Sequence, residues 1–337
     1  MSVYPGDTGG GTVYVRRDMW KLQQENGTWE PYTKYYALAV REMQKRQPTD
    51  PTSWIYQANI HGSWDQVPPG ADWNQCQHAS WWFLPWHRMY IFQFEAIVRA
   101  AVIQLDGPED WALPYWNYSR PYPYNTLPPA LRSPTMDDGT PNALYVPHPK
   151  RNPLPAPGIN GGAQLTATTV DPTVAMNTPN FSPPPASSFG GGKLPQPQHF
   201  DSATGALEGR PHNGVHVAVG GSSNPEAPQG NWGWMTDPNM AARDPVFWLH
   251  HSNIDRLWAH WNQAGHPDAG DQNWLDQTFP LYDANKQRVE MKLADVLNPG
   301  TPQSKMNYRY DDLPEPGAPA TPEVAAAAEG GGGGGGA

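Results

Sequence analysis

The sequence predicts a mainly α-helical fold with little β structure, in which a four-helix bundle is wrapped by long irregular loops rich in Pro and Gly. Several stretches repeat apolar residues at helical spacing, while 40 Pro and 33 Gly interrupt the chain between them. Aromatic residues make up 12% of the 337 residues and include 16 Trp, the reverse of a disordered composition. We therefore expect irregular loops around a dense aromatic core.

The first part of the chain, residues 13–120, has a largely helical pattern. Residues Tyr32–Gln47 carry apolar side chains at helical spacing and stop before Pro48. A shorter helix is expected over Ser53–Ile60. The stretch Arg88–Leu105 predicts a long helix with an apolar face, which the Asp-Gly-Pro sequence at 106–108 ends.

Residues 121–205 are crowded with Pro, Gly, Thr and Asn and show no regular pattern. We interpret this segment as an irregular covering packed on the helices; the alternative is a mobile insertion. The helical pattern returns through His212–Val219 and over Asp244–Asn262. We therefore predict one domain over residues 1–312, followed by a low-complexity flexible tail or linker over residues 313–337.

Charge and cysteine content exclude several classes of function. The 22 Lys and Arg against 32 Asp and Glu give a formal charge of −10, so neither nucleic acid nor an anionic membrane is an expected partner. No run approaches the roughly 18 apolar residues of a membrane span. The single cysteine, Cys76, excludes an intrachain disulfide framework and Cys-based metal sites. The N-terminus lacks the regions of an ordinary secretory signal, which leaves the compartment open.

The 11 histidines include two clusters with the spacing of metal ligands. The first contains His61, His78 and His87. In the second, His212 and His216 are four residues apart and would stack on one helix face, and the adjacent pair at 250 and 251 follows. For an isolated histidine, a core or surface role is the simplest interpretation. Six histidines at paired spacing among Trp and Phe favour a binding site instead.

His78 and His87 are nine residues apart, so on one helix they would lie on opposite sides. We expect Pro85 to break that helix, which places His78 in the preceding loop and His87 in the first turn of the next helix. His61 would come from the end of the Ser53–Ile60 helix. Three histidines per site from two helix pairs is the arrangement that a four-helix bundle offers for a dinuclear core.

The ligand type restricts the metal. No carboxylate or thiolate lies at ligand spacing, so each site would offer neutral imidazole only, a donor that suits Zn, Cu, Fe and Ni. A single three-histidine zinc site with water as the fourth ligand is the main alternative. Two matching sets in one chain favour a pair of redox metal ions.

Two long motifs resemble the copper signatures of the tyrosinase family of type 3 copper proteins, which includes tyrosinases, catechol oxidases and molluscan hemocyanins. The first motif starts at His78 and continues through Phe83-Leu-Pro-Trp-His-Arg, with Glu95 following. The second is the run Asp-Pro-Val-Phe-Trp-Leu-His-His-Ser-Asn-Ile-Asp from Asp244 to Asp255. The resemblance implies two copper ions as cofactors and O₂ as co-substrate.

The resemblance also assigns the histidines to the two ions. It implies copper A ligands at His61, His78 and His87, and copper B ligands at His212, His216 and His251. The family motif has its ligand at the second histidine of the 250–251 pair, so His250 is expected to be a packed neighbour. In relatives with Cys-x-His at this place the sulfur bonds to the imidazole, which implies a thioether between Cys76 and His78. The alternative for Cys76 is a small buried hydrophobe.

Further residues around the site follow from the resemblance. Similar plant-type enzymes carry a Glu four residues before the first copper B ligand, here Glu208, which with Asn213 holds a water near copper B. That water would accept the proton of an incoming phenol; the alternative for Glu208 is a helix N-terminal acid. Asn213 and Val217 each follow a copper B ligand and are expected to border the substrate pocket. Relatives often have a bulky residue over copper A from the loop before the second motif; here Pro238 falls at that offset, and Met240 near it is expected to border the pocket too.

The resemblance extends from the Val-Arg-Arg sequence at 15–17 to the Tyr-Arg-Tyr sequence at 308–310. In related enzymes a Tyr-x-Tyr element closes the domain against an N-terminal Arg. We therefore expect Tyr308 and Tyr310 to pack on Arg16 or Arg17 through cation–π contact.

The activity implied by the resemblance is that of a dicopper polyphenol oxidase, which oxidises o-diphenols to o-quinones with O₂ and also ortho-hydroxylates monophenols. The alternatives are an o-aminophenol oxidase on the same site and a hemocyanin-like oxygen-binding protein. The expected partner is a phenolic small molecule. Bacterial relatives can leave the cell with a copper-delivery helper protein, so the location is either cytoplasmic or exported, and the oligomeric state is not predicted.

Overall fold

The computed structural model describes residues 12–22, 28–155, 158–183, 187–198, 203–221 and 232–313. The predicted tail lies outside these residues from position 314 onwards. The described chain is mostly helical, as the sequence predicts, with two small two-stranded sheets. None of the described helices combines the length and the apolar character needed to cross a membrane.

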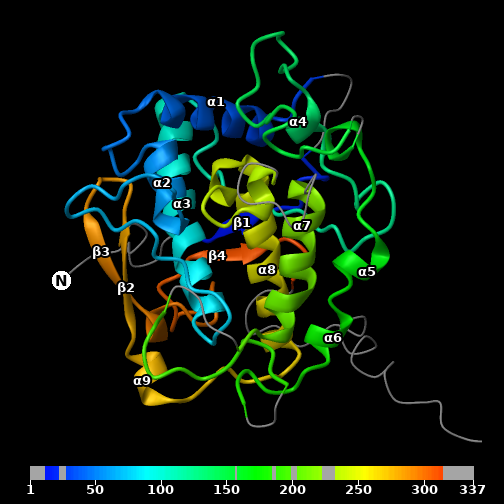
Figure 1. Ribbon diagram of the computed structural model, residues 1–337. Helices are drawn as coiled ribbons and strands as arrows, with labels where there is room; N and C mark the ends of the chain where they lie inside the picture. Colours follow the sequence, from blue (N-terminus) through cyan, green and yellow to red (C-terminus); the bar gives the residue numbers. More distant parts are fainter. Residues whose placement is uncertain are drawn as a thin grey trace, which may run out of the picture.

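The longer helices form the centre of the molecule, with α2 and α3 to the left of α7 and α8 in Figure 1 and α1 across the top. Helices α3 and α8 pack against each other and are buried along most of their length. These helices are α1 (Pro31–Lys45), α2 (Trp54–His61), α3 (Phe83–Gln104), α7 (Gly214–Gly220) and α8 (Pro245–Gln263).

The remaining elements are short and lie around this centre. The hairpin of β2 and β3, which packs beside α3, has no counterpart in the sequence prediction. The strands are β1 (Tyr14–Arg16), β2 (Thr278–Tyr282), β3 (Arg288–Lys292) and β4 (Tyr308–Tyr310), and the short helices are α4 (Pro129–Arg132), α5 (Ala167–Val170), α6 (Thr173–Met176) and α9 (Gln272–Leu275). Among the described residues, four short 3₁₀ turns, which are wound more tightly than an α-helix, are η1 (Ile159–Gly161), η3 (Trp234–Thr236), η4 (Ala241–Arg243) and η5 (Leu293–Asp295). The element η2 (Glu208–Asn213) is a wider, π-type turn.

Side-chain caps explain where the first two helices begin. The Glu30 carboxylate accepts a hydrogen bond from the Tyr32 amide (2.8 Å) at the start of α1. The Ser53 hydroxyl accepts one from the Tyr56 amide (3.1 Å) at the start of α2. Because α2 ends at His61, the helix delivers this side chain to the interior, as predicted.

Helix α3 begins five residues earlier than the sequence predicts, and Pro85 lies inside its first turn instead of ahead of the helix. A proline is tolerated there because the first four amides of a helix have no intrahelical acceptor. His87 therefore lies in the second turn rather than the first. His78 lies in the preceding loop, as predicted. The whole stretch 62–82 is loop, so the helical part of residues 13–120 is smaller than expected.

The helix predicted from His212 begins two residues later, at the start of α7. The residues before it form the wider π-type turn η2, in which Arg210 has an extended backbone (φ −155°, ψ 128°). Helix α8 begins and ends within one residue of its predicted bounds. Its start is fixed by the Asp244 carboxylate, which accepts a hydrogen bond from the Val246 amide (3.0 Å) and caps the helix.

The predicted irregular covering, residues 121–205, contains only short helices among its described residues and packs on the helical centre. Arg151 joins the two parts, since its fully buried guanidinium makes two 2.8 Å contacts to the Asp244 carboxylate at the start of α8. The same guanidinium donates to the carbonyl oxygens of Leu131 and Leu144. One buried ion pair therefore ties the covering to the helix that carries His251.

The two ends of the described chain meet in a parallel sheet, where Arg16 of β1 lies opposite Tyr310 of β4. The Arg16 guanidinium carbon lies 3.5 Å from the centroid of the Tyr308 ring, so the expected cation–π contact is present. Arg17 instead lies over the Tyr32 ring, at 4.4 Å. Of the two arginines, Arg16 is therefore the one that packs on the Tyr-Arg-Tyr sequence at the other end of the described chain.

Arg16 also belongs to a buried ion-pair network. Its Nε donates to Glu95 of α3 (2.7 Å) and its Nη1 to Asp255 of α8 (3.2 Å), while Arg88 Nε donates to the other oxygen of Asp255 (2.5 Å). Burial by itself would raise the pKa of Asp255, but Arg88 and Arg16 lower it below its ordinary value, so the carboxyl is charged. The network joins the two chain ends to α3 and α8.

We expect Arg16→Met to lower the free energy of unfolding by about 3–5 kcal/mol, because it leaves Glu95 and Asp255 buried without this partner. Arg17→Met is the matched control, because that side chain is one-third exposed and its ion pair with Asp110 is long, at 4.0 Å. A loss below about 1 kcal/mol is expected for it. Urea unfolding followed by circular dichroism measures both. Equal losses in the two variants would contradict the role of the network.

Candidate metal centre

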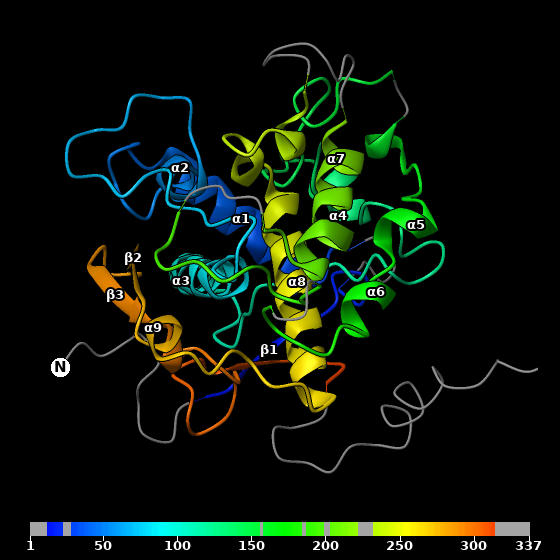
Figure 2. The ribbon, with the colours of Figure 1, turned by 60° about the horizontal axis from the view of Figure 1, so that its bottom comes forward.

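Six predicted histidines converge in the interior between the helices. His61 is the last residue of α2, His87 lies on α3, His216 on α7 and His251 on α8. His78 comes from the loop before α3, and His212 from the turn η2. In Figure 2, α3 is seen nearly end-on with α8 and α7 beside it. We call these six residues the histidine cage.

The first three histidines form one group. The ring centroids of His61 and His78 are 5.3 Å apart, those of His61 and His87 are 5.5 Å apart, and those of His78 and His87 are 5.2 Å apart. Three rings at nearly equal separation can direct one nitrogen each to a common point. The predicted copper A set is therefore brought together in space.

The second group is His212, His216 and His251, with ring centroids 4.6, 4.9 and 5.5 Å apart. The Nε2 atoms of His216 and His251 are separated by 3.4 Å. Two nitrogens bound at about 2.05 Å to one tetrahedral metal ion lie about 3.3 Å apart. The observed spacing therefore fits two ligands of a shared ion.

The two groups touch each other. The rings of His87 and His251 are stacked, with centroids 4.3 Å apart and an interplanar angle of 11°. His78 and His212 also lie close, at 6.1 Å between centroids. Two metal ions held by these groups would be neighbours rather than independent sites.

The second ring nitrogen of several histidines is held by an acceptor outside the cage. The Nδ1 atoms of His61, His87 and His216 lie 2.9, 2.8 and 2.6 Å from the backbone carbonyls of Pro238, Phe83 and Met235, and His212 Nδ1 lies 2.9 Å from Asn213 Oδ1. Nδ1–H donation to these oxygens leaves the Nε2 lone pair for a ligand.

Burial keeps the rings neutral. It lowers the pKa of His87, His212 and His251 well below the ordinary value, and it lowers the pKa of His216 to about 4. The buried Nε2 atoms of His87 and His212 have no hydrogen-bond partner among the described residues. A buried nitrogen acceptor without a donor is costly unless it coordinates something. The cage therefore fits metal ions bound by neutral imidazole.

His250 lies beside the second group, and its ring is stacked on His212 with centroids 5.2 Å apart. Its Nδ1 lies 3.1 Å from the Tyr118 hydroxyl. By ligand-atom distance, both His250 and His251 group with His212 and His216, but His251 also groups with His61 and His87. Because His251 lies within reach of both histidine groups and His250 of only one, His251 is favoured as the ligand and His250 as its packed neighbour.

Cys76 is buried, and its sulfur lies within 4.8 Å of ligand atoms of His61 and His78. Burial raises the pKa of its thiol well above the ordinary value. The predicted thioether to His78 is a covalent bond whose formation stays a prediction, and the proximity of the two residues is compatible with it.

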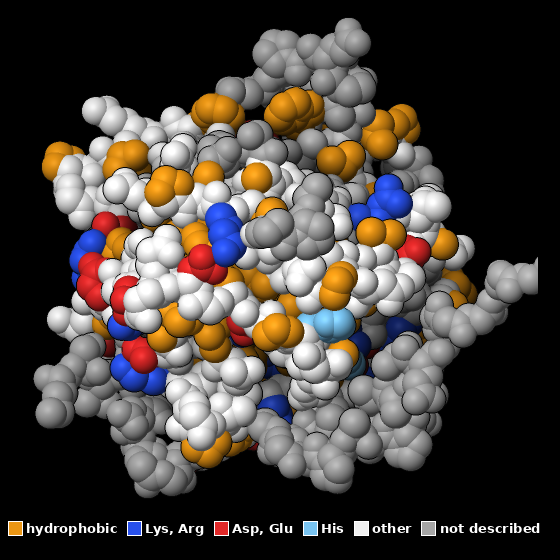
Figure 3. Space-filling model, turned by 90° about the horizontal axis from the view of Figure 1, so that it is seen from below, with side chains coloured by type: hydrophobic (Ala, Val, Ile, Leu, Met, Phe, Trp, Pro, Cys, Tyr) orange, Lys and Arg blue, Asp and Glu red, His pale blue; other side chains and the backbone are white. Residues whose placement is uncertain are grey.

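A cavity of ≈ 400 Å³ opens beside the cage. Asn213 and Val217 line it, as the sequence predicts, and Val217 is more than half exposed at its edge. Met240 is not among its lining residues; Pro238 lines it instead. The full lining is His61, His78, Ala79, Thr204, Glu208, His212, Asn213, His216, Val217, Met235, Thr236 and Pro238. Seen from below (Figure 3), histidine reaches the surface near the middle of the face, among uncharged and hydrophobic atoms.

Glu208 lines the same cavity and is buried. Its Oε1 accepts a hydrogen bond from the Ala79 amide (2.7 Å), while Oε2 has no hydrogen-bond partner among the described residues. Burial raises the pKa of Glu208 to about 8. The side chain therefore joins the loop of His78 to the turn of His212 and leaves one carboxyl oxygen for a water or ligand.

Two family models match the chain. A model described as the common central domain of tyrosinase matches residues 51–264, which include the whole histidine cage. A model described as the polyphenol oxidase middle domain matches residues 268–323.

Individual relatives agree with these matches. The chain is 37% identical over 312 residues to tyrosinase HcTyr1 of Hahella sp., covering 84% of this chain and 60% of the relative. It is 33% identical over 313 residues to a chloroplastic polyphenol oxidase of Vitis vinifera, covering 88% and 48%. The crystal structure of Grenache (Vitis vinifera) polyphenol oxidase superposes with a TM-score of 0.66 at 27% identity, covering 93% of this chain and 89% of that one. The chain thus spans about half to three-fifths of the curated relatives' length.

We expect His251→Ala to lower the copper content of the reconstituted protein from two ions to about one per chain, because the second group loses a ligand. His250→Ala is the matched control, since both side chains are almost completely buried, and it is expected to keep two ions. Metal analysis by mass spectrometry after copper loading measures both. Loss of an ion in His250→Ala alone would reverse the assignment within the pair.

Proposed function

The chain belongs to the tyrosinase family, and on that premise we propose that it is a copper-dependent phenol oxidase of the type 3 class. The histidine cage carries the proposal, because its six buried or half-buried imidazole rings form two adjacent groups. His61, His78 and His87 would hold one copper ion, and His212, His216 and His251 the other. Helices α2, α3, α7 and α8 would act as the four-helix support of the pair.

Bound copper would supply the two-electron oxidation of an o-diphenol by O₂, which yields an o-quinone and water. The protein's part is to admit and orient the phenol. The cavity beside the cage offers apolar contacts from Val217 and Pro238 and opens to solvent, so that a phenol ring can approach the cage. The second class of function, an oxygen carrier, would need a site that phenols cannot enter, and the open cavity favours the oxidase.

We further propose that monophenols are ortho-hydroxylated at the same site, with Glu208 and Asn213 holding a water. Glu208 Oε2 has no partner among the described residues, and Asn213 lines the same cavity with its Oδ1 occupied by His212. A water between them would take the proton of the phenol hydroxyl and pass it to Glu208 in its ionised form, which a pKa of about 8 makes abundant only above neutral pH. The phenolate is the form that can then be hydroxylated.

The copper-loaded protein is expected to oxidise catechol with uptake of O₂ and formation of quinone colour, and to contain two copper ions and no zinc per chain. Spectrophotometry and an oxygen electrode measure the reaction, and metal analysis measures the content. Reversible oxygen binding without quinone would favour the carrier, and one zinc per chain would favour the single three-histidine zinc site. Faster turnover of an o-aminophenol than of catechol would favour the alternative that the chain is an o-aminophenol oxidase.

We expect Glu208→Gln to lower kcat/KM for a monophenol by about 10²–10⁴-fold, the usual contribution of a general base, and to change that for the matching diphenol much less. Gln keeps an oxygen for the Ala79 amide, so the loop of His78 is expected to hold its position. Steady-state kinetics on tyrosol and hydroxytyrosol compare the two reactions. An equal fall in kcat/KM for both substrates would contradict the role of Glu208 as a general base.

A further inference from the structure

A cavity of ≈ 370 Å³ lies away from the histidine cage, between the starts of α2 and α8 and the loop 143–150. It shares no lining residue with the cavity beside the cage. Its volume is at the lower end of the range of about 300–1,000 Å³ for small-molecule sites. It is therefore large enough for one small ring-containing molecule.

Three aromatic side chains line this cavity: Trp54, Tyr145 and Trp234. The Trp54 indole N–H donates to the Arg243 carbonyl oxygen (3.2 Å), and its ring lies edge-on to Phe94 with centroids 5.8 Å apart. These contacts fix the Trp54 ring, which is almost completely buried, in the cavity wall, and the half-buried rings of Tyr145 and Trp234 offer the more accessible surface for another ring.

Two cationic side chains, Lys150 and Arg243, line the same cavity, and no acidic residue among the described residues does so. Lys150 Nζ lies 5.5 Å from the centroid of the Trp234 ring. Arg243 uses Nη2 to contact Asp65 (2.8 Å), while its buried Nε has no hydrogen-bond partner in the described chain. Lys150 thus adds a positive charge to the lining, while the charge of Arg243 is already paired with Asp65. This charge favours an anionic ligand.

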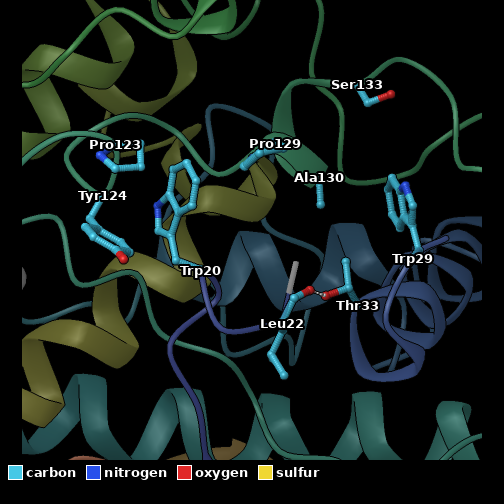
Figure 4. Close-up of a pocket in the computed structure, with 9 residues that line it drawn as sticks. All are labelled: Trp20, Leu22, Trp29, Thr33, Pro123, Tyr124, Pro129, Ala130 and Ser133. Carbon is cyan, nitrogen blue, oxygen red and sulfur yellow. Dashed lines mark hydrogen bonds between the residues drawn. The ribbon is translucent and has the colours of Figure 1, made fainter. Parts of the chain in front are cut away.

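A different cavity, of ≈ 480 Å³, provides an internal comparison. Figure 4 shows Trp20 and Trp29 on either side of it, with Tyr124 beside Trp20. Among the described residues no charged side chain lines it, and the Thr33 hydroxyl donates to the Leu22 carbonyl oxygen. It offers aromatic surface without charge, so it has no means of selecting an anion.

We propose that the cavity of Trp54, Lys150, Trp234 and Arg243 is a second ligand site, which takes a small planar aromatic carboxylate. The ring packs on the indole surfaces, and the carboxylate accepts a charge-assisted hydrogen bond from Lys150, with Arg243 Nε as the second donor. A neutral aromatic molecule lacks the second contact, and an aliphatic anion lacks the first. The combination defines the ligand class.

The site also contacts the supports of the cage. Trp54 is the first residue of α2, whose last residue is His61. Trp234 precedes Met235, whose carbonyl oxygen holds His216 Nδ1. An occupant would therefore touch elements that hold both histidine groups without entering their cavity.

Calorimetric titration of the copper-loaded protein with 2-naphthoate tests the proposal. We expect a site whose Kd rises about tenfold in Lys150→Gln, because one charge-assisted contact is lost. Lys193→Gln is the matched control, since Lys193 Nζ lies 5.6 Å from the Trp81 ring but lines no part of this cavity. 2-Naphthamide, which has the same ring without the charge, is expected to bind at least tenfold more weakly than 2-naphthoate.

Removal of copper separates this site from the histidine cage, because no histidine lines the cavity and its 2-naphthoate binding should persist. Equal affinity in wild type and Lys150→Gln, or equal weakening in Lys193→Gln, would overturn the proposal. So would equal binding of the amide, which would point to uncharged aromatic surface such as that of Figure 4. Binding that disappears with copper would assign the ligand to the cage instead.

Discussion

The six imidazole rings of the histidine cage lie against one another and can bind metal only in their neutral form, and this constraint governs much of the surrounding structure. Their burial lowers the pKa of the rings, while outer acceptors fix which nitrogen carries the proton. Three of those acceptors are backbone carbonyls, at Phe83, Met235 and Pro238. The paths of α3 and of the turns near η3 are therefore as much a part of the centre as the histidines themselves.

Charged groups lie outside the cage but close to it along the same helices. Asp255 follows His251 by four residues on α8, and Arg88 follows His87 directly on α3. Their ion pair, completed by Arg16, fixes the two helices whose rings stack at 4.3 Å. The ion-pair network thus lies beside the neutral histidine cage. The network fixes the positions of α3 and α8, and the cage depends on those positions.

The sequence predicted the parts of this structure that depend on local spacing. The four-residue separation of His212 and His216, the long helices and the contact of Arg16 with Tyr308 follow from periodicity and from the family motif. The extended backbone at Arg210, the entry of Pro85 into α3 and the carbonyl oxygens that hold the rings depend on contacts between distant segments. Pro238 lines the cavity and Met240 does not, a choice between neighbouring loop residues that spacing along the chain cannot make.

The parallel pairing of β1 with β4 also has a consequence for biosynthesis. Residues 14–16 are synthesised well before their strand partner at 308–310, which follows nearly all of the described chain. Until then Arg16 has no Tyr308 to cover it, and the ion pairs between α3 and α8 are incomplete. Completion of the network beside the cage would accordingly come later than the synthesis of the last cage histidine, His251.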